Sequence, residues 1–354
     1  MSFRITTNGL FRTYGTAMRT QNKKVYDALE RVQTNRKFAH FSEDPASAAK
    51  AFRLRRDHWR STDFLDNTNF LISKQEIAYS AGSAIVNGDD RVPSLDGIYE
   101  SLAGLSDTAG AGRKPLGYEL SAKAESIASA MNVTFNEEFV FAGADGLNVP
   151  FTWDGDKLLY RGIDVSAETG SEDYERLQKM AAENTYVDIG QGMKENDQGV
   201  IPNSAYDSCL SGLTFLGYGT DEDGDSKNLA VLMRELGNLY QNCDPDTGDY
   251  PGINHDAQEA NKARAQTLSL KIHDAINRVQ EQHVALSAGS NFLQQNKRQL
   301  EETQFTLQEQ ISQVEKLDDT GALAIEEMAW AQYVYEAALH VGNDLLSHSL
   351  FDYM

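Results

Sequence analysis

The fold is decided by residues 272–314, which read IHDAINRVQEQHVALSAGSNFLQQNKRQLEETQFTLQEQISQV. Apolar residues occupy every seventh position here, as in a helix that buries one narrow stripe against a partner helix. The positions three residues further on are small or polar and can form hydrogen bonds. The pattern predicts a helix over 257–317, about 90 Å long and therefore part of an elongated molecule. The apolar row is Ile272, Val279, Leu286, Leu293, Leu300, Leu307 and Val314, and the second row is Ala275, Gln282, Gly289, Asn296, Thr303 and Gln310.

A shorter version of this pattern closes the chain. The sequence Asp318-Asp319-Thr320-Gly321 stops the long helix, and a helix over 321–350 resumes the frame. Two coaxial or slightly kinked helices fit this arrangement. The rows of the second helix are Met328 and Tyr335, and Leu317, Ala324, Ala331, Ala338 and Leu345.

The N-terminal segment carries a matching stripe, which predicts a helix over 11–39. Its half-heptad positions are partly polar, and a seam this thin does not stabilise a lone helix. We therefore expect both terminal helices to need helical partners. Each is about 45 Å long, so we expect the two chain ends to meet at one pole. The apolar row is Phe11, Met18, Val25, Val32 and Ala39, and the positions between are Tyr14, Gln21, Ala28 and Asn35.

Two further helices are indicated between these segments. Ser42 or Asp44 can cap a helix with Pro45 in its first turn, and its seven-spaced row ends near residue 90. A third helical run over 116–138 follows a glycine-rich stretch. The two rows are Ala51, His58, Leu65, Ile72, Tyr79 and Val86, and Leu116, Leu120, Ile127, Met131 and Phe135.

From Phe139 the pattern changes to short aromatic and β-branched runs, separated by Asp-Gly pairs at 145–146 and 154–155. This is typical of β-hairpins, with 186–190 and 213–219 as further strands. The predicted fold class is mainly α: an elongated bundle of long antiparallel heptad helices from both termini, with a central β-rich (α+β) insert. The predicted divisions are 1–42 and 318–354 for a terminal coiled-coil domain, 43–138 and 256–317 for a helical rod, and 139–255 for an outward insert.

Charge is unevenly distributed along the 354 residues, whose formal net charge is -21. Residues 1–60 hold 13 Lys and Arg against 5 Asp and Glu, a net of +8. Residues 161–260 hold 6 against 20, a net of -14. The overall acidity argues against a general nucleic-acid binder, and no stretch approaches the ~18 apolar residues of a membrane span. We expect neither nucleic acid nor membrane as a partner.

No group of residues has the spacing of a catalytic or metal site. His340, Asp344 and His348 share a helix face but lack a further ligand, and we interpret them as a polar face. The acidic segment 221–225 has its glycine at the fourth rather than the sixth position of a calcium loop, and we interpret it as a solvated turn. We therefore predict no enzyme activity, no cofactor and no metal.

Two smaller features have alternatives. Arg53, Arg56 and Arg60 share a helix face that suits either phosphate or acidic surfaces of neighbouring subunits or helices, and we favour the acidic surfaces because the chain itself is acidic. Cys209 and Cys243 could pair, but two thiols make no disulfide framework. We interpret them as small core residues.

Short motifs at both ends of the chain carry a resemblance. Phe3-Arg4-Ile5-Thr6, the helix end at 31–36 and Ser42-Glu43-Asp44-Pro45-Ala46 come first. Asn132, Phe141-Ala142-Gly143 and Pro150-Phe151 follow at the entry to the insert, and residues 345–354 close the set with Asp352-Tyr353. Together they resemble the flagellin superfamily, and within it the hook–filament junction branch, for which Pro45 and the closing Asp-Tyr pair are typical. The departures are Glu43, Phe351, Met354 and Thr34-Asn35-Arg36, where the family has a glycine-containing turn.

The resemblance implies a structural adaptor that joins the bacterial flagellar hook to the filament and assembles as a ring through its terminal helices. It implies four partners: further copies of the chain, hook-associated protein 1, flagellin and an export chaperone. It also implies an extracellular location after type III export, and the first thirty residues lack the apolar block of a cleaved signal peptide. The expected assembly interface is Phe11, Met18, Val25, Val32, Met328, Tyr335, Ala338, Leu345 and Leu350, and the family motif is Ser42, Asp44, Pro45, Phe141, Gly143, Pro150, Phe151, Asp352 and Tyr353.

Two other functions and one simpler fold stay open. A flagellin filament subunit would polymerise alone into long filaments. A stalk-borne extracellular enzyme or adhesin would need a binding or catalytic set, and residues 165–255 show no nucleophile, base and oxyanion group. The simpler fold is an ordinary, self-contained helix bundle.

Overall fold

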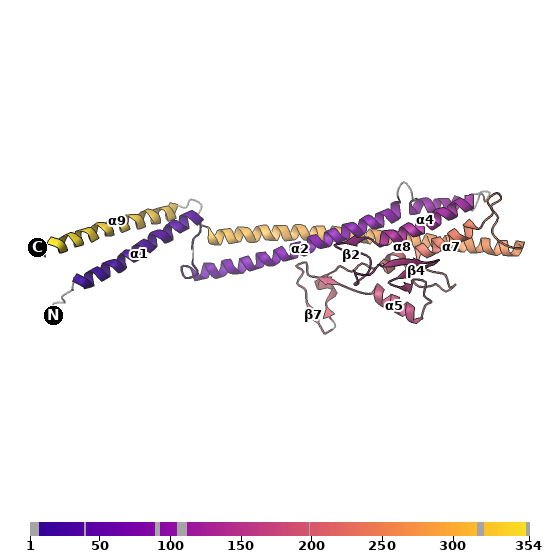
Figure 1. The fold of residues 1–354 in the computed structure, drawn as a ribbon, viewed down its shortest axis with the longest axis horizontal. Coiled ribbons are helices and arrows are strands. Elements are labelled where there is room, and N and C mark those ends of the chain that lie inside the picture. Colours follow the sequence, from indigo (N-terminus) through magenta and orange to yellow (C-terminus); the bar gives the residue numbers. More distant parts are fainter. Residues whose placement is uncertain are drawn as a thin grey trace. The chain divides into compact units, whose positions relative to one another are not determined.

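The computed structural model describes residues 7–38, 40–88, 93–104, 112–197, 199–316 and 322–351. Long helices account for about half of these residues (Figure 1). Shorter helices and small antiparallel sheets lie between the second and the third of these long helices in the sequence. The predicted fold class, mainly α with a β-containing insert, is confirmed. The long helices are α1 (Thr7–Thr34), α2 (Pro45–Asn87), α8 (His255–Glu315) and α9 (Ala322–Phe351).

The chain divides into two compact units. One contains residues 1–63 and 301–354, and the other contains residues 64–300. Helices α2 and α8 each contribute to both units. In the part of the chain that the structure describes, no helix combines the length and apolarity needed to cross a bilayer.

The N-terminal helix ends earlier than predicted. Helix α1 stops at Thr34 rather than near Ala39, because Asn35 takes a left-handed backbone conformation with φ of 55°. The N–H of Arg36 then donates to the carbonyl of Arg31 at 3.3 Å and closes the helix end. Asparagine tolerates this conformation better than most residues, so Asn35 explains how the turn forms without glycine. Ala39 lies outside the described residues.

The unit of residues 64–300 is built on the antiparallel packing of α2 and α8. The apolar row of α8 is buried there as predicted. The predicted row of α2 is wrong at Tyr79, which is 41% exposed. The polar residues Thr68 and Gln75 are buried instead, because α8 supplies their hydrogen-bond partners. Gln75 Nε2 donates to the Leu286 carbonyl at 3.1 Å, and Asn296 Nδ2 donates to Thr68 Oγ1 at 3.3 Å.

Three shorter helices extend this core: α3 (Leu95–Gly104), α4 (Arg113–Met131) and α7 (Leu229–Gln241). Helices α4 and α7 pack closely where Gly117 meets Gly237. A Cβ on Gly117 would lie 2.7 Å from the Gly237 carbonyl oxygen, and one on Gly237 would lie 2.7 Å from Ser121 Oγ. Only glycine lets these backbones approach so closely.

The insert contains short strands in four small antiparallel sheets, with order β1-β2, β3-β4-β5, β6-β9 and β7-β8. The hairpin predicted at Asp154-Gly155 is confirmed, because Asp154 pairs with Lys157 and Gly155 has φ of 60°. The strands are β1 (Thr134–Phe135), β2 (Glu138–Phe139), β3 (Phe151–Asp154), β4 (Lys157–Tyr160), β5 (Ile163–Asp164), β6 (Tyr186–Val187), β7 (Glu195–Asn196), β8 (Gly199–Val200) and β9 (Tyr206–Asp207).

Several predicted elements of the insert are wrong. The third helical run ends at Met131 rather than 138, and Phe135 belongs to β1. Residues 213–216 are helical in α6 (Gly212–Leu216) rather than a strand, with Leu213, Phe215 and Leu216 all buried. A short apolar run that is buried on every side fits a helical turn as well as a strand. Helix α5 (Glu172–Ala181) and a 3-10 turn, η2 (Pro202–Ser204), complete the insert.

Candidate assembly surface

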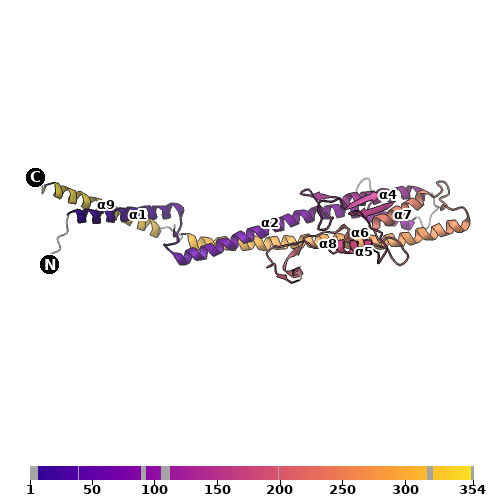
Figure 2. The same cartoon turned by 60° about the horizontal axis from the view of Figure 1, so that its bottom comes forward.

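The two terminal helices pack against each other within the first unit. Helices α1 and α9 lie side by side in both views (Figure 1 and Figure 2). They run antiparallel, since Tyr14 Oη donates to the Ala338 carbonyl at 2.9 Å while Arg31 Nη1 lies 3.3 Å from Glu327 Oε2. The terminal helices therefore pair with each other, which gives each the helical partner that its partly polar seam was expected to need.

The two helices approach each other closely at Tyr14 and Gly342. The phenol of Tyr14 fills the space in front of the Gly342 Cα, and a Cβ there would overlap the Tyr14 ring. Gly342 is buried for this reason. Gly342 is not indicated by the sequence pattern, because a glycine in a helical run carries no hydrophobic signal.

The predicted interface residues whose side chains the structure describes all lie on this pair. Each is half-buried, in keeping with a seam shared between α1 and α9. They are Phe11, Met18, Val25 and Val32 on α1, and Met328, Tyr335 and Ala338 on α9. The side chains of Leu345 and Leu350 lie outside the described part of the structure. That these residues contact other subunits stays a prediction.

Large apolar side chains remain exposed on the same pair. Trp330 is 68% exposed and Tyr333 is 64% exposed, and their rings stack with centroids 5.8 Å apart. Tyr26 projects likewise from α1. The stacked rings of Trp330 and Tyr333 form an exposed aromatic pair of the kind found at interaction sites. Other exposed apolar residues of α9 are Leu323, Ile325, Leu339 and Val341. The heptad pattern does not indicate these residues, because they lie off its rows.

Charge also separates the two helices. Helix α1 carries Arg and Lys at five positions against Asp27 and Glu30, whereas α9 has no Lys or Arg. Opposite charge on the two helices favours their pairing with each other. The basic residues of α1 are Arg12, Arg19, Lys23, Lys24 and Arg31, and the acidic residues of α9 are Glu326, Glu327, Glu336 and Asp344.

The first family motif forms the start of α2. Asp44 rather than Ser42 caps the helix, because its carboxylate accepts the Ser47 N–H at 3.0 Å. Hydrogen bonds from the side chain and the backbone N–H of Ser47 lower the pKa of the Asp44 carboxyl. Pro45 occupies the first helical position, where the missing N–H costs nothing. Ser42 is exposed.

The second motif joins the insert to the helices. Phe141 is buried, and its carbonyl accepts the Tyr160 hydroxyl at 3.0 Å. Gly143 has φ of 76°, and a Cβ there would lie 2.6 Å from Glu183 Oε2. That carboxylate also pairs with Arg161 at 2.9 Å. Gly143 is thus required both by its backbone conformation and by the approach of Glu183.

The remaining motif residues hold the end of α4 to β3. Asn132 Nδ2 donates to the Phe151 carbonyl at 2.8 Å, and the Phe151 N–H donates to Asn132 Oδ1 at 2.9 Å. Pro150 is buried, and its carbonyl accepts the Arg161 N–H at 2.9 Å. Asp352 and Tyr353 lie outside the described residues.

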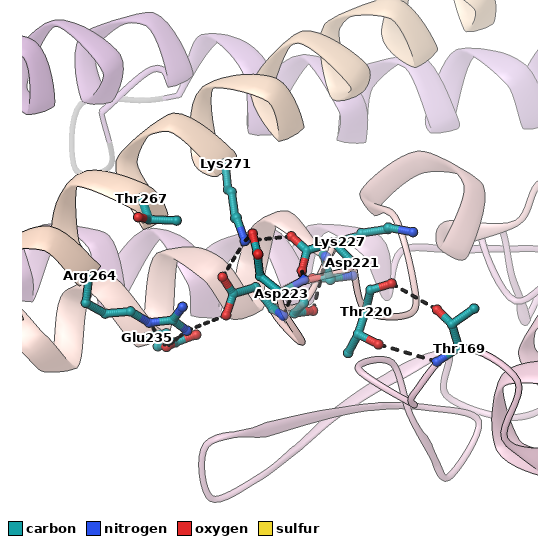
Figure 3. Close-up of polar contacts among 12 residues, drawn as sticks. Thr169, Thr220, Asp221, Asp223, Lys227, Glu235, Arg264, Thr267 and Lys271 are labelled. Atoms are coloured by element: carbon teal, nitrogen blue, oxygen red, sulfur yellow. Dashed lines mark hydrogen bonds and ion pairs between the residues drawn. The ribbon is translucent and has the colours of Figure 1, made fainter.

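The negative charge of the acidic loop 221–225 is neutralised by a lysine of the same chain. The carboxylates of Asp221, Asp223 and Asp225 lie within 4.8 Å of one another, as metal ligands do. Lys271 of α8 reaches into this group (Figure 3), with Nζ 2.7 Å from Asp221 Oδ2 and 3.0 Å from Asp223 Oδ2, and it also pairs with Asp225. The Lys271 ammonium occupies the position between these carboxylates that a metal cation would take.

Asp225 also pairs with Arg264, whose Nη2 lies 2.5 Å from its Oδ1. Its side chain is only 5% exposed, so the prediction of a solvated turn is wrong at this residue. Although burial acts to raise it, the hydrogen bonds from Arg264 and Lys271 lower the pKa of the Asp225 carboxyl. The loop is an ion-paired link to α8.

The other candidate sites are simpler. His340 and Asp344 are exposed on α9, and the side chain of His348 lies outside the described residues. Cys209 and Cys243 are both free thiols, as predicted, and Cys243 is buried. Cys209 is only half-buried, so it is not fully a core residue.

These features define a class of protein: the two ends of one chain pair as helices in one unit, and a second unit combines long helices with an insert of short strands. Flagellar hook-associated proteins have this fold. The chain is similar to a Vibrio parahaemolyticus protein described as a flagellar hook-associated protein, with 14% identity, a TM-score of 0.54, and coverage of 77% of this chain and 100% of that chain. It is also similar to FlgL of Xanthomonas campestris, with 13% identity, a TM-score of 0.51, and coverage of 73% and 99%.

At this identity the likeness establishes the fold. No family model matches the chain. No curated protein matches it either. The resemblance carried by the terminal motifs is therefore confirmed at the level of the fold, and function has to be argued from the surfaces.

Proposed function

We propose that this protein is a structural subunit of the bacterial flagellum that joins the hook to the filament, and that it assembles as a ring through its terminal helices. The observation that carries the proposal is the exposed face of the α1/α9 pair. Trp330 and Tyr333 project from α9, which buries few side chains against α1. Such a face gains stability by packing against further helices.

The fold supports the same proposal. The two solved structures described above share the fold across nearly their whole length, and FlgL is among them. The partners we propose are further copies of this chain, hook-associated protein 1, flagellin and an export chaperone that holds the C-terminal helices. The location we propose is the outside of the cell, reached through flagellar type III export without a cleaved signal peptide. We propose no catalytic activity.

The test uses the double variant Trp330→Ser/Tyr333→Ser in the full chain. Hook fragments that carry hook-associated protein 1 are incubated with the variant and then with flagellin, and filament growth from the hooks is counted by electron microscopy. We expect the variant to be lost from the junction and filaments not to grow. Tyr118→Ser is the matched control, because Tyr118 is an exposed aromatic residue of α4 outside the terminal pair.

Junctions that form normally with the double variant would contradict the proposal. The same assay separates the alternative of a filament subunit, since a purified chain that grows long filaments from hooks without flagellin acts as a flagellin. The five-part domain division also stays part of the proposal, with the insert of residues 139–255 facing outward.

A further inference from the structure

A second exposed face in the first unit combines aromatic and basic side chains. Phe52 is 66% exposed and Trp59 is 63% exposed on the first part of α2. Three arginines are exposed beside them, at positions 53, 56 and 60. The spacing i, i+1, i+4, i+7, i+8 places all five on one side of the helix. We call Phe52, Arg53, Arg56, Trp59 and Arg60 the basic face.

The opposite side of the same helical segment is already occupied within the chain. Ala51 is buried, and Arg55 Nη2 pairs with Glu315 Oε2 of α8 at 2.5 Å. The basic face is thus directed away from the chain's own packing. Among the described residues, the ion pair of Arg56 is with the adjacent Asp57, at 3.3 Å. An arginine on such a surface can still bind a carboxylate and stack on an aromatic ring.

A surface complementary to the basic face exists on the same protein. The outward side of α9 presents Glu326, Trp330, Tyr333 and Glu336, all of them exposed. Their spacing of four, three and three residues keeps them on one helix side. Helix α9 has no Lys or Arg to oppose an incoming arginine. We call these four residues the acidic stripe.

The two surfaces match in length as well as in charge. At ~1.5 Å per residue the basic face extends about 12 Å along α2 and the acidic stripe about 15 Å along α9. Both combine charged and aromatic residues, so that carboxylates can meet guanidinium groups while the aromatic rings stack on one another. Both also remain exposed in the single chain.

We propose that the acidic stripe of α9 in one copy docks on the basic face of α2 in a neighbouring copy. This inference rests on the proposed self-assembly and names the surfaces that meet. It brings the two carboxylates of the acidic stripe, Glu326 and Glu336, to the arginines of the basic face, in line with the overall acidity of the chain. It also places Trp330 and Tyr333 against Phe52 and Trp59 in the assembly.

The test is a charge exchange between full-length chains. One variant carries Arg53→Glu, Arg56→Glu and Arg60→Glu, and the other carries Glu326→Arg and Glu336→Arg. Self-association is measured by sedimentation velocity over increasing concentration, with circular dichroism to show that each variant stays folded. We expect each variant alone to associate about tenfold more weakly than the unmodified chain, since several exposed charge pairs are reversed.

The decisive sample is the equimolar mixture of the two variants. The reversed face of the first is complementary to the reversed stripe of the second, so association should return toward that of the unmodified chain. The control carries Lys157→Glu, Lys179→Glu and Lys194→Glu, which make the same change of charge at exposed positions of the other unit. We expect the control to associate normally.

Three outcomes would overturn the inference. Normal association of the arginine variant would show that the basic face is not part of the contact. A weakened arginine variant that the mixture does not restore would show that the face binds something else, such as the acidic segment 161–260 of another copy or a phosphate polymer. An unmodified chain that never associates would remove the proposed self-assembly as well, whereas the first two outcomes leave that assembly standing.

Discussion

Tyr14 packs directly against Gly342 across the two terminal helices: the Tyr14 hydroxyl donates to the Ala338 carbonyl at 2.9 Å, and the ring fills the space that a Cβ on Gly342 would need. The contact lies in a pair of helices that otherwise buries little. We therefore expect it to control whether α1 and α9 stay together.

The first prediction concerns Gly342→Ala. The added methyl group must displace the Tyr14 ring, at a cost of about 1–3 kcal/mol that the gain of ~1 kcal/mol in helix propensity only partly offsets. We expect faster amide hydrogen exchange along α9. Gly15→Ala in α1 is the matched control, because a Cβ there meets nothing within 4 Å. The control should exchange no faster than the unmodified chain, and equal exchange in both variants would contradict the assignment of Gly342.

The second prediction concerns the ends of the free subunit. Because the thin seam of α1 and α9 leaves large aromatic side chains exposed, these helices should open more readily than α8, whose row from Ile272 to Leu300 is buried. Limited proteolysis should remove the terminal segments first and leave a resistant middle of about residues 45–317. Equal protection of the ends and the middle in dilute solution would argue against assembly-dependent ordering.

The third prediction concerns Lys271→Met. The change leaves three carboxylates close together without the ammonium that pairs with all of them. We expect a loss of about 2 kcal/mol in the free energy of unfolding, less than for a fully buried ion pair. Urea unfolding at neutral pH measures this. A loss no greater than that of Lys227→Met on the same loop would show that Lys271 is not the loop's counter-ion.

The fourth prediction concerns acid. Hydrogen bonds hold the pKa of the Asp221 and Asp225 carboxyls below the usual 3.8, even though burial acts in the other direction. The stability they contribute is present above the unfolded-state pKa and is lost as pH falls through the lower, folded-state pKa. Asp225→Asn should unfold with a weaker pH dependence below pH ~4 than the unmodified chain. An identical pH dependence would exclude Asp225 as a contributor.

The fifth prediction concerns His283, which stacks on Tyr79 with ring centroids 4.5 Å apart and has a buried Nδ1 without a hydrogen-bond partner among the described residues. Burial lowers its pKa, so the unfolded chain binds this proton at higher pH than the folded chain. Stability should therefore fall as pH drops below ~6.5. His283→Gln should lack this dependence in urea unfolding between neutral pH and pH ~5, while replacement of exposed His340 should retain it.

The sequence alone determined the helical frame. Unbroken seven-residue spacing from Ile272 to Val314 predicts α8 within two residues at each end, and Asp44-Pro45 predicts the start of α2. Such periodicity and capping act locally, through neighbours a few residues apart, and are therefore legible in one chain. The terminal motifs likewise predicted the fold that the solved structures share.

Only the tertiary structure decided which polar residues are buried and which apolar residues stay exposed. Thr68 and Gln75 enter the core because α8 supplies their hydrogen-bond partners, and Asp225 enters because Lys271 and Arg264 neutralise it. Trp330 stays exposed because its helix turns another side toward α1. Burial of a polar group depends on a partner distant in the sequence, and no local pattern encodes that partner.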